Sequence, residues 1–179
     1  VGSTIIEVIN SPYTLHGGQT NQPARTILTL DPTGPLAAPA GLEWPFDATT
    51  PQTPDPTYTD WVYTFHGNPR TNQWMINGEQ FPNISIRDFN LNDIIILEVR
   101  NLSPTEHPFH LHGHGFEVLS INGQAPPYRM MEDNINVGVR QVLRLRLLAN
   151  NPGDWMTHCH ILPHADGGMM TVLRINDGP

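Results

Sequence analysis

Apolar residues recur along this chain in short runs and in alternation, the two patterns that β-strands produce. The clearest alternation is at residues 143–147, which read Leu-Arg-Leu-Arg-Leu, so that one strand face is apolar and the other charged. Runs rich in β-branched residues and bounded by Gly, Asn or Pro predict further strands. The predicted strands are "TIIEVIN" (4–10), "ARTILTL" (24–30), "DWVYTFHG" (60–67), "DIIILEVRNL" (93–102), "FEVLSING" (116–123) and "RQVLRLRLLAN" (140–150).

These strands fall into two groups separated by a proline-rich stretch. Between residues 31 and 57 there are seven prolines and no sustained hydrophobic period, which predicts a linker. Residues 58–179 combine short strands with turns and lack a convincing helical period, so we expect an all-β domain, a Greek-key β-sandwich or barrel. Two strands cannot bury a core alone, and we interpret residues 1–57 as the end of a preceding domain plus the linker.

Composition and charge narrow the functional classes. The 18 prolines, 15 glycines and 15% charged residues favour turns and strands over long helices. A net charge of -8 argues against nucleic acid and anionic membranes as partners, since both require a basic surface. The chain starts at Val1 without a methionine, so we expect a trimmed or cleaved product.

Histidine is concentrated in two short segments, "HPFHLHGH" (107–114) and "HCHILPHADGGMM" (158–170). The second also holds the single cysteine and two methionines. Thiolate, imidazole and thioether form the ligand set of copper electron-transfer sites, where two His and one Cys lie in a plane and Met binds weakly along the axis. Zinc is the alternative, but structural zinc sites have little use for methionine.

Strand alternation divides these ligands between two faces. If "THCH" (157–160) is extended, Cys159 points to one face and its two neighbouring histidines to the other. The predicted site on the first face consists of His107, Cys159 and His164. The predicted site on the second face, four neutral imidazoles suited to copper ions that bind oxygen, consists of His110, His112, His158 and His160. Only one of Met169 and Met170 can face the first site, and alternation alone leaves that choice open.

The segments "HPFHLHGHGF" and "GDWMTHCHILPHADGGMM" resemble the two C-terminal copper signatures of the multicopper oxidases, the family of the laccases. The resemblance includes "WMINGEQFP" and "NNPGDW" and covers the chain from about residue 58 onward. It implies that residues 58–179 form a C-terminal cupredoxin domain. The preceding segment resembles the passage from the second to the third cupredoxin domain.

The resemblance also implies roles for the ligands and copper of three types as cofactor. The implied type 1 ligands are His107, Cys159, His164 and, along the axis, Met169. The implied type 2 ligand is His110, and the implied type 3 ligands are His112, His158 and His160. In the family a type 1 copper takes electrons singly from a reducing substrate, and the peptide His158, Cys159 and His160, here the catalytic residues, conducts them to a trinuclear cluster that reduces dioxygen to water. An axial methionine should lower the type 1 potential and favour easily oxidised substrates.

Two departures from the family pattern shape the expectations. The family's trinuclear cluster uses eight histidines, and the four from two His-x-His motifs of a first domain are missing here, so we expect a partner: the N-terminal portion of the same precursor. Some relatives carry a carboxylate directly after the second type 1 histidine, whereas this chain has Ala165 there and Asp166 next, which leaves the proton route open.

We therefore expect a laccase-like oxidase acting on small phenolic or aromatic reductants, secreted or periplasmic. The alternatives are a cuprous or ferrous ion oxidase of the same family and a stand-alone blue-copper electron carrier. The carrier would leave the four histidines of the second face without a role. We expect His114 to be structural, and we expect the methionines outside the ligand segment, Met75, Met130, Met131 and Met156, to fill the core.

Overall fold

The computed structural model of the protein describes residues 6–10, 13–14, 21–22, 25–30 and 53–178. The chain divides into two compact units, Val1–Asp47 and Ala48–Pro179. In the first unit, β1 (Ile6–Asn10) pairs antiparallel with β4 (Arg25–Leu30), and β2 (Tyr13–Thr14) pairs with β3 (Asn21–Gln22). The two strands predicted here are thus present, and they pair with each other. The predicted linker lies mostly outside the described residues.

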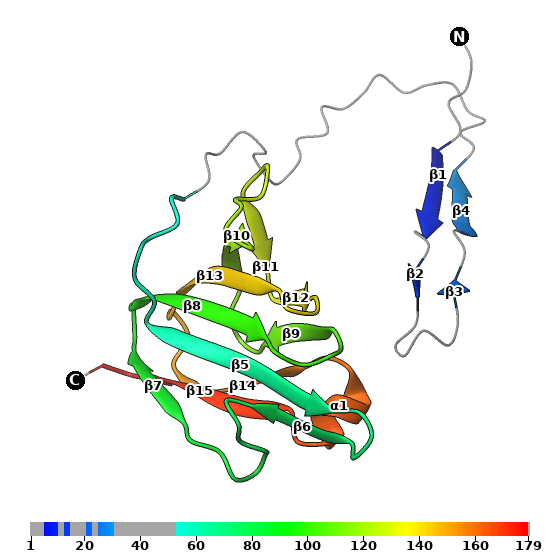
Figure 1. Ribbon diagram of the computed structural model, residues 1–179. Helices are drawn as coiled ribbons and strands as arrows, with labels where there is room; N and C mark the ends of the chain where they lie inside the picture. The colour runs from blue at the N-terminus through cyan, green and yellow to red at the C-terminus, as the bar shows by residue number, and fades with distance from the viewer. Residues whose placement is uncertain (1–5, 11–12, 15–20, 23–24, 31–52, 179) are drawn as a thin grey trace, which may run out of the picture. The chain divides into compact units, whose positions relative to one another are not determined.

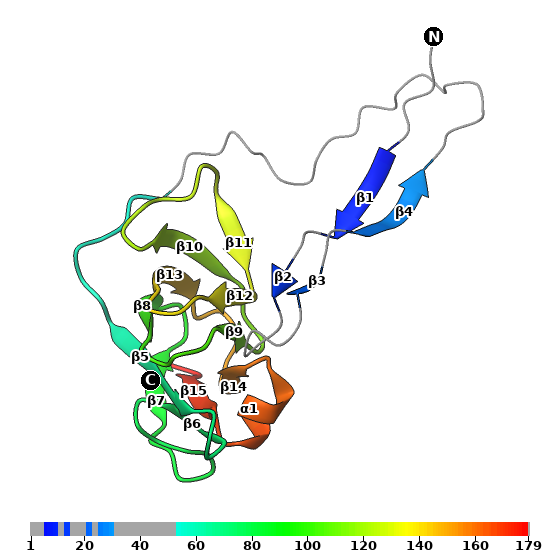
Figure 2. The ribbon, with the colours of Figure 1, turned by 45° about the vertical axis from the view of Figure 1, so that its right-hand side comes forward.

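The second unit is a sandwich of two β-sheets (Figures 1 and 2). The first sheet has the strand order β11-β10-β13-β8-β5-β6 and the second has the order β12-β9-β14-β15-β7. The first contains β5 (Trp61–Asn68), β6 (Gln73–Ile76), β8 (Ile94–Asn101), β10 (Phe116–Ile121), β11 (Met130–Glu132) and β13 (Val142–Leu148). The second contains β7 (Arg87–Asn90), β9 (His107–Leu111), β12 (Asn134–Val137), β14 (Gly153–Cys159) and β15 (Met170–Asn176). A short helix, α1 (Leu162–Asp166), connects β14 to β15. The all-β sandwich expected from the sequence is confirmed.

Strand β13 shows how the alternating pattern builds the core. Leu143, Leu145 and Leu147 are fully buried between the sheets, whereas Arg144 and Arg146 lie on the opposite face. Because β13 pairs with β8 on one side and β10 on the other, its leucines meet apolar residues from both neighbours. Each such buried leucine contributes roughly 1.5–3 kcal/mol of hydrophobic stabilisation.

The outer face of this sheet holds the segment that precedes β5. The Arg144 guanidinium donates to the carboxylate of Asp55 at 2.7 Å and to the hydroxyl of Thr59 at 2.6 Å. It also donates to the backbone carbonyls of Pro56 at 2.6 Å and Tyr58 at 2.7 Å. An arginine presents five donors in a fixed plane, so one side chain satisfies acceptors along a segment that forms no strand of its own.

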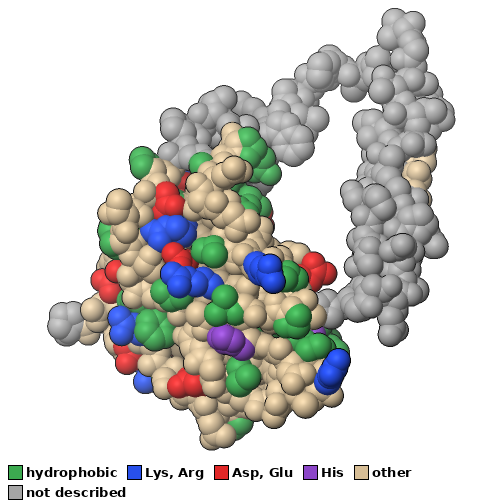
Figure 3. All heavy atoms as spheres, in the orientation of Figure 1, with side chains coloured by type: hydrophobic (Ala, Val, Ile, Leu, Met, Phe, Trp, Pro, Cys, Tyr) green, Lys and Arg blue, Asp and Glu red, His purple; other side chains and the backbone are tan. Residues whose placement is uncertain are grey.

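The surface of the second unit mixes charges of both signs. On the face in Figure 3, acidic and basic side chains alternate among apolar ones, and no continuous basic surface is present there. Among the described residues, no helix is long and apolar enough to cross a membrane.

The expectation that four methionines fill the core is wrong for three of them. Met75 is half-buried and lies on the face of β6 opposite to the buried residues of that strand, outside the core cluster. Met131 and Met156 are 48% and 38% exposed. Met131 pairs with Glu117 on the outer face of the first sheet, and Met156 lies on the β14 face opposite to the core. Both strands are amphipathic, and these methionines occupy outward positions.

Glu117 is a buried carboxylate on the outer face of β10. It accepts hydrogen bonds from the backbone N–H of Thr53 at 3.3 Å and from the Thr53 hydroxyl at 3.1 Å, and it pairs with Arg146 and Arg129. Burial alone would raise the pKa of Glu117, but the Thr53 hydrogen bonds and the two guanidinium charges outweigh it and hold the pKa below its usual value. The carboxylate therefore stabilises the fold while it is ionised.

Replacing Glu117 with glutamine should lower the free energy of unfolding by about 1–3 kcal/mol near neutral pH, because two arginines lose their counter-charge. Since the folded-state pKa is lowered, this contribution is present above the unfolded-state pKa of about 4.3 and is lost as the pH falls through the folded-state value. Urea unfolding of both proteins should therefore show a gap near neutral pH that narrows in acid. A gap of equal size at both pH values would contradict this role.

Candidate metal centres

Strands β9 and β14 bring the two histidine-rich segments side by side. They pair antiparallel, with His158 opposite His110 and Cys159 opposite Phe109. Residues directly opposite each other in a ladder share a face of the sheet. His158 and His110 therefore lie on one face, and Cys159 lies on the other, among the core residues. The division predicted from strand alternation is confirmed.

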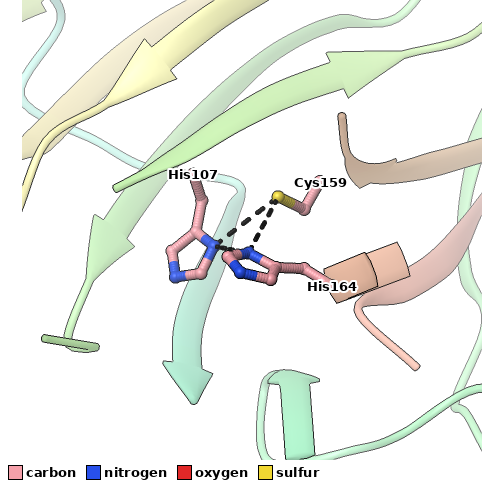
Figure 4. A group of neighbouring side chains, drawn as sticks. All are labelled: His107, Cys159 and His164. Atoms are coloured by element: carbon pink, nitrogen blue, oxygen red, sulfur yellow. Dashed lines mark hydrogen bonds between the residues drawn. The ribbon is translucent and has the colours of Figure 1, made fainter. Parts of the chain in front are cut away.

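The buried group consists of His107, Cys159 and His164 (Figure 4). Cys159 Sγ lies 3.5 Å from His107 Nδ1 and 3.7 Å from His164 Nδ1, and the two nitrogens are 3.1 Å apart. The three residues are 0%, 0% and 5% exposed. His107 begins β9, Cys159 ends β14, and α1, which starts with Leu162 and Pro163, carries His164 back toward the thiol.

A loop before β9 determines which nitrogen of His107 faces the thiol. Asn101 Oδ1 accepts from the N–H of Ser103 at 2.9 Å, and Ser103 Oγ donates to the carbonyl of Thr105 at 2.8 Å. Since the serine proton is used in that bond, Ser103 Oγ accepts from Nε2–H of His107, 2.5 Å away. Nδ1 of His107 then carries the lone pair, on the side of Cys159. These loop residues belong to no metal-ligand motif, so the sequence pattern did not identify them.

The register of β15 distinguishes the two methionines. Met170 pairs with His158 and therefore shares the outward face of that histidine. Met169 is fully buried in the same core cluster as Cys159, and its carbonyl accepts from the Cys159 N–H at 3.1 Å. The thioether on the Cys159 side is thus that of Met169, as the family resemblance implied.

The opposite face gathers the other four predicted histidines. Ligand nitrogens of His110, His112 and His158 all lie within 4.8 Å of one another, and Nε2 of His112 is 2.9 Å from Nε2 of His158. His160 follows directly after β14, with its ring centroid 5.3 Å from that of His110 and 5.8 Å from that of His158. The structure therefore places all four imidazoles together on this face.

Backbone carbonyls fix the tautomers of two histidines on this face, His110 and His158. The Nδ1 of His110 lies 2.8 Å from the carbonyl of Asp133, and the Nδ1 of His158 lies 2.9 Å from the carbonyl of Cys159. Each Nδ1 therefore bears the proton, and each Nε2 bears the lone pair. Burial lowers the pKa of His158, and the three neighbouring histidines lower it further. Neutral imidazoles with free lone pairs are metal ligands.

His114 belongs to neither ligand group within the described residues. Its ring is 6% exposed and meets Trp155 edge-on, with the centroids 5.5 Å apart. Gly113 before it has a φ of +69°, and a Cβ there would lie 2.2 Å from the Trp155 ring. The turn between the strands therefore requires glycine, and His114 packs beside it.

The donor atoms fit copper. Burial raises the pKa of the Cys159 thiol to about 11, so a bound cation is needed to hold the thiolate at neutral pH. A thiolate, two imidazoles and a buried thioether are the ligands of blue copper sites. Neither group includes a carboxylate among the described residues, and imidazole alone suits copper on the second face.

Comparison with known proteins agrees with this chemistry. The family described as "Multicopper oxidase" matches residues 53–179. A multicopper oxidase of Staphylococcus haemolyticus is 37% identical over 109 residues, 57% of this chain and 24% of that protein. The multicopper oxidase MmcO of Mycobacterium tuberculosis is 33% identical over 165 residues, 86% of this chain and 32% of that protein.

The crystal structure of a laccase from Pediococcus acidilactici matches with a TM-score of 0.62 and 30% identity, over 71% of this chain and 29% of that one. This likeness confirms the predicted cupredoxin-like sandwich. The chain spans 24% and 32% of the length of the two curated relatives.

Replacing Ser103 with alanine should weaken copper binding at the Cys159 site by about 10-fold or more, because His107 loses the bond that fixes its Nδ1 lone pair. Titration against a copper chelator, followed by thiolate-to-copper absorption, measures the affinity. Ser120→Ala is a matched control, since Ser120 is also buried but its hydroxyl bonds Asp55 at 2.8 Å. Equal affinities for the two variants would show that Ser103 plays no part.

Proposed function

Because this chain belongs to the multicopper oxidase family, we propose that it is the C-terminal copper-binding part of a laccase-like oxidase. The proposed reaction couples one-electron oxidation of small phenolic or aromatic reductants to the reduction of dioxygen to water. The observation that carries the proposal is the peptide His158-Cys159-His160, whose thiol lies in the buried group while both flanking imidazoles lie on the opposite face.

We assign the ligands as the resemblance implies. Type 1 copper would be held by His107, Cys159, His164 and Met169. Type 2 copper would be held by His110, and the type 3 pair would be held by His112, His158 and His160. When bound, copper supplies one-electron chemistry at the first site and dioxygen reduction at the second.

The chain itself links the two sites covalently and shields the first site from water. The peptide bonds on either side of Cys159 give a continuous covalent path between the two sites, with no gap through space. Burial of His107 and Cys159 keeps water from the thiolate site. The fixed Nε2 lone pairs of His110 and His158 favour metal binding on the second face without reorientation of the rings.

We further propose that a partner completes the second site. His112 and His160 are exposed, and four imidazoles are half the number that a trinuclear cluster of this family uses. The proposed partner is the N-terminal portion of the same precursor, carrying two His-x-His motifs, in a secreted or periplasmic protein. Closure by such a partner would exclude water and complete the coordination.

The alternative functions differ in the copper sites that they require and in the reductant that they oxidise. A stand-alone blue-copper carrier needs only the buried group and gives no reason for four imidazoles gathered on the other face. A cuprous or ferrous ion oxidase uses the same centres and differs only in the reductant. Assays with a phenol, ferrous iron and cuprous ion distinguish the oxidases.

Replacing Cys159 with serine should abolish the visible absorption of the copper-loaded protein, because the charge transfer that colours such sites requires the thiolate sulfur. Thr157→Ser is a matched control, since Thr157 is equally buried on the same face of β14. Absorption spectra after copper loading and removal of excess metal give the result. A blue serine variant would refute the assignment of Cys159.

Copper content and oxygen uptake test the partner. The isolated chain should bind copper at the Cys159 site but fail to reduce dioxygen to water, because its second face offers an incomplete ligand set. Co-expressed with the N-terminal portion, it should hold about four copper ions per unit, against about one for a carrier. Oxygen uptake with an easily oxidised phenol is the assay. Full four-electron reduction by the isolated chain would overturn the need for a partner.

A further inference from the structure

Trp74 in β6 lies flat against one of the buried histidines. Its ring centroid is 3.6 Å from that of His164, and the two planes are 24° apart. The same indole meets His107 edge-on, with centroids 5.4 Å apart. Trp74 is only 2% exposed. One side chain therefore contacts both imidazoles of the Cys159 site and covers them from solvent.

Hydrogen bonds hold both the side chain and the backbone of Trp74. The indole Nε1–H donates to Asn72 Oδ1 at 2.7 Å, and the backbone N–H of Trp74 donates to the carbonyl of Gly167 at 3.4 Å. Gln80 Nε2 donates to the same carbonyl at 2.6 Å. The tryptophan and the loop after α1 are thus tied together, and α1 carries His164.

Two glycines leave the space that the indole occupies. A Cβ at Gly67 would lie 2.1 Å from Trp74 Cε3, and a Cβ at Gly167 would lie 2.6 Å from Trp74 Cδ1. Neither glycine has a positive φ, so backbone conformation does not demand glycine at these positions. The close approach of Trp74 does.

We propose that Trp74 is a positioning residue for the type 1 copper ligands, which fixes the ring plane of His164 and excludes water from the site. This inference rests on the proposed function. An imidazole binds metal along the lone pair in its ring plane, so a stacked neighbour that prevents tilting fixes the direction of the bond from Nδ1. The apolar surroundings of a copper site set its reduction potential, because water stabilises the more highly charged cupric state.

The test compares variants of the copper-loaded full chain by reduction potential and by the thiolate-to-copper absorption band. Trp74→Leu should lower the potential and shift or weaken the band, since leucine neither stacks nor covers the ring. Trp74→Phe keeps an aromatic ring at this position, so it should retain most of the wild-type potential and absorption band. Trp61→Leu is the control, because Trp61 is a half-buried tryptophan that contacts Tyr63 and Arg87 and no ligand histidine among the described residues.

The outcomes separate the two proposals. A wild-type protein that binds copper without the band would refute the proposed function itself. A blue wild type with Trp74→Leu unchanged, or with Trp61→Leu changed equally, would overturn the role of Trp74 and leave the function standing.

A variant that keeps the indole covers the case in which Trp74→Leu does not fold, as judged by circular dichroism without copper. Gly67→Ala retains Trp74 but forces it to move, and it should also shift the band and the potential. An unchanged band and an unchanged potential in a folded Gly67→Ala protein would overturn the role of Trp74.

Discussion

The alternation of side chains at the end of β14 is the constraint on which both sites depend. Successive residues of a strand face opposite ways, so Cys159 enters the core only if its two neighbours leave it. A slip of one residue against β9 would exchange the thiol and the imidazoles between faces. The six residue pairs between β14 and β15, and the apolar partners Phe109 and Leu111 on β9, fix the register against such a slip.

Alternation alone does not build a metal site, because ligand atoms must also point at a common centre. On the buried side, that task falls to groups from elsewhere in the sandwich, the loop around Ser103 and the indole of Trp74. On the other side, the backbone carbonyls of Asp133 and Cys159 orient the rings of His110 and His158. The hydrogen-bond partners therefore leave the lone pair on different ring nitrogens, Nδ1 for His107 in the core and Nε2 for His110 and His158 on the outer face.

These differences explain what could be predicted from the sequence. Long alternating or apolar strands such as β13 and β8 were predicted, whereas short mixed strands such as Arg87–Asn90 and Met130–Glu132 carry too little pattern and were missed. The division of the histidines follows from spacing alone, because a strand has a period of two. The choice between Met169 and Met170 required the register of β15 or the family resemblance. The support from Ser103 and Trp74 depends on tertiary contacts that no local pattern encodes.

The attachment of residues 53–60 to the outer face of the first sheet has a practical consequence for protein engineering. The side chains of Arg144 and Glu117 form hydrogen bonds with residues of this segment. The Asp60 carboxylate accepts a hydrogen bond from the N–H of Ile96 at 2.7 Å. A fusion junction placed at the start of β5 would remove the hydrogen-bond partners of these groups. A junction before Thr53 would preserve them. For fusion to another protein, the domain boundary should therefore be placed at Thr53, eight residues before β5, and not at Trp61.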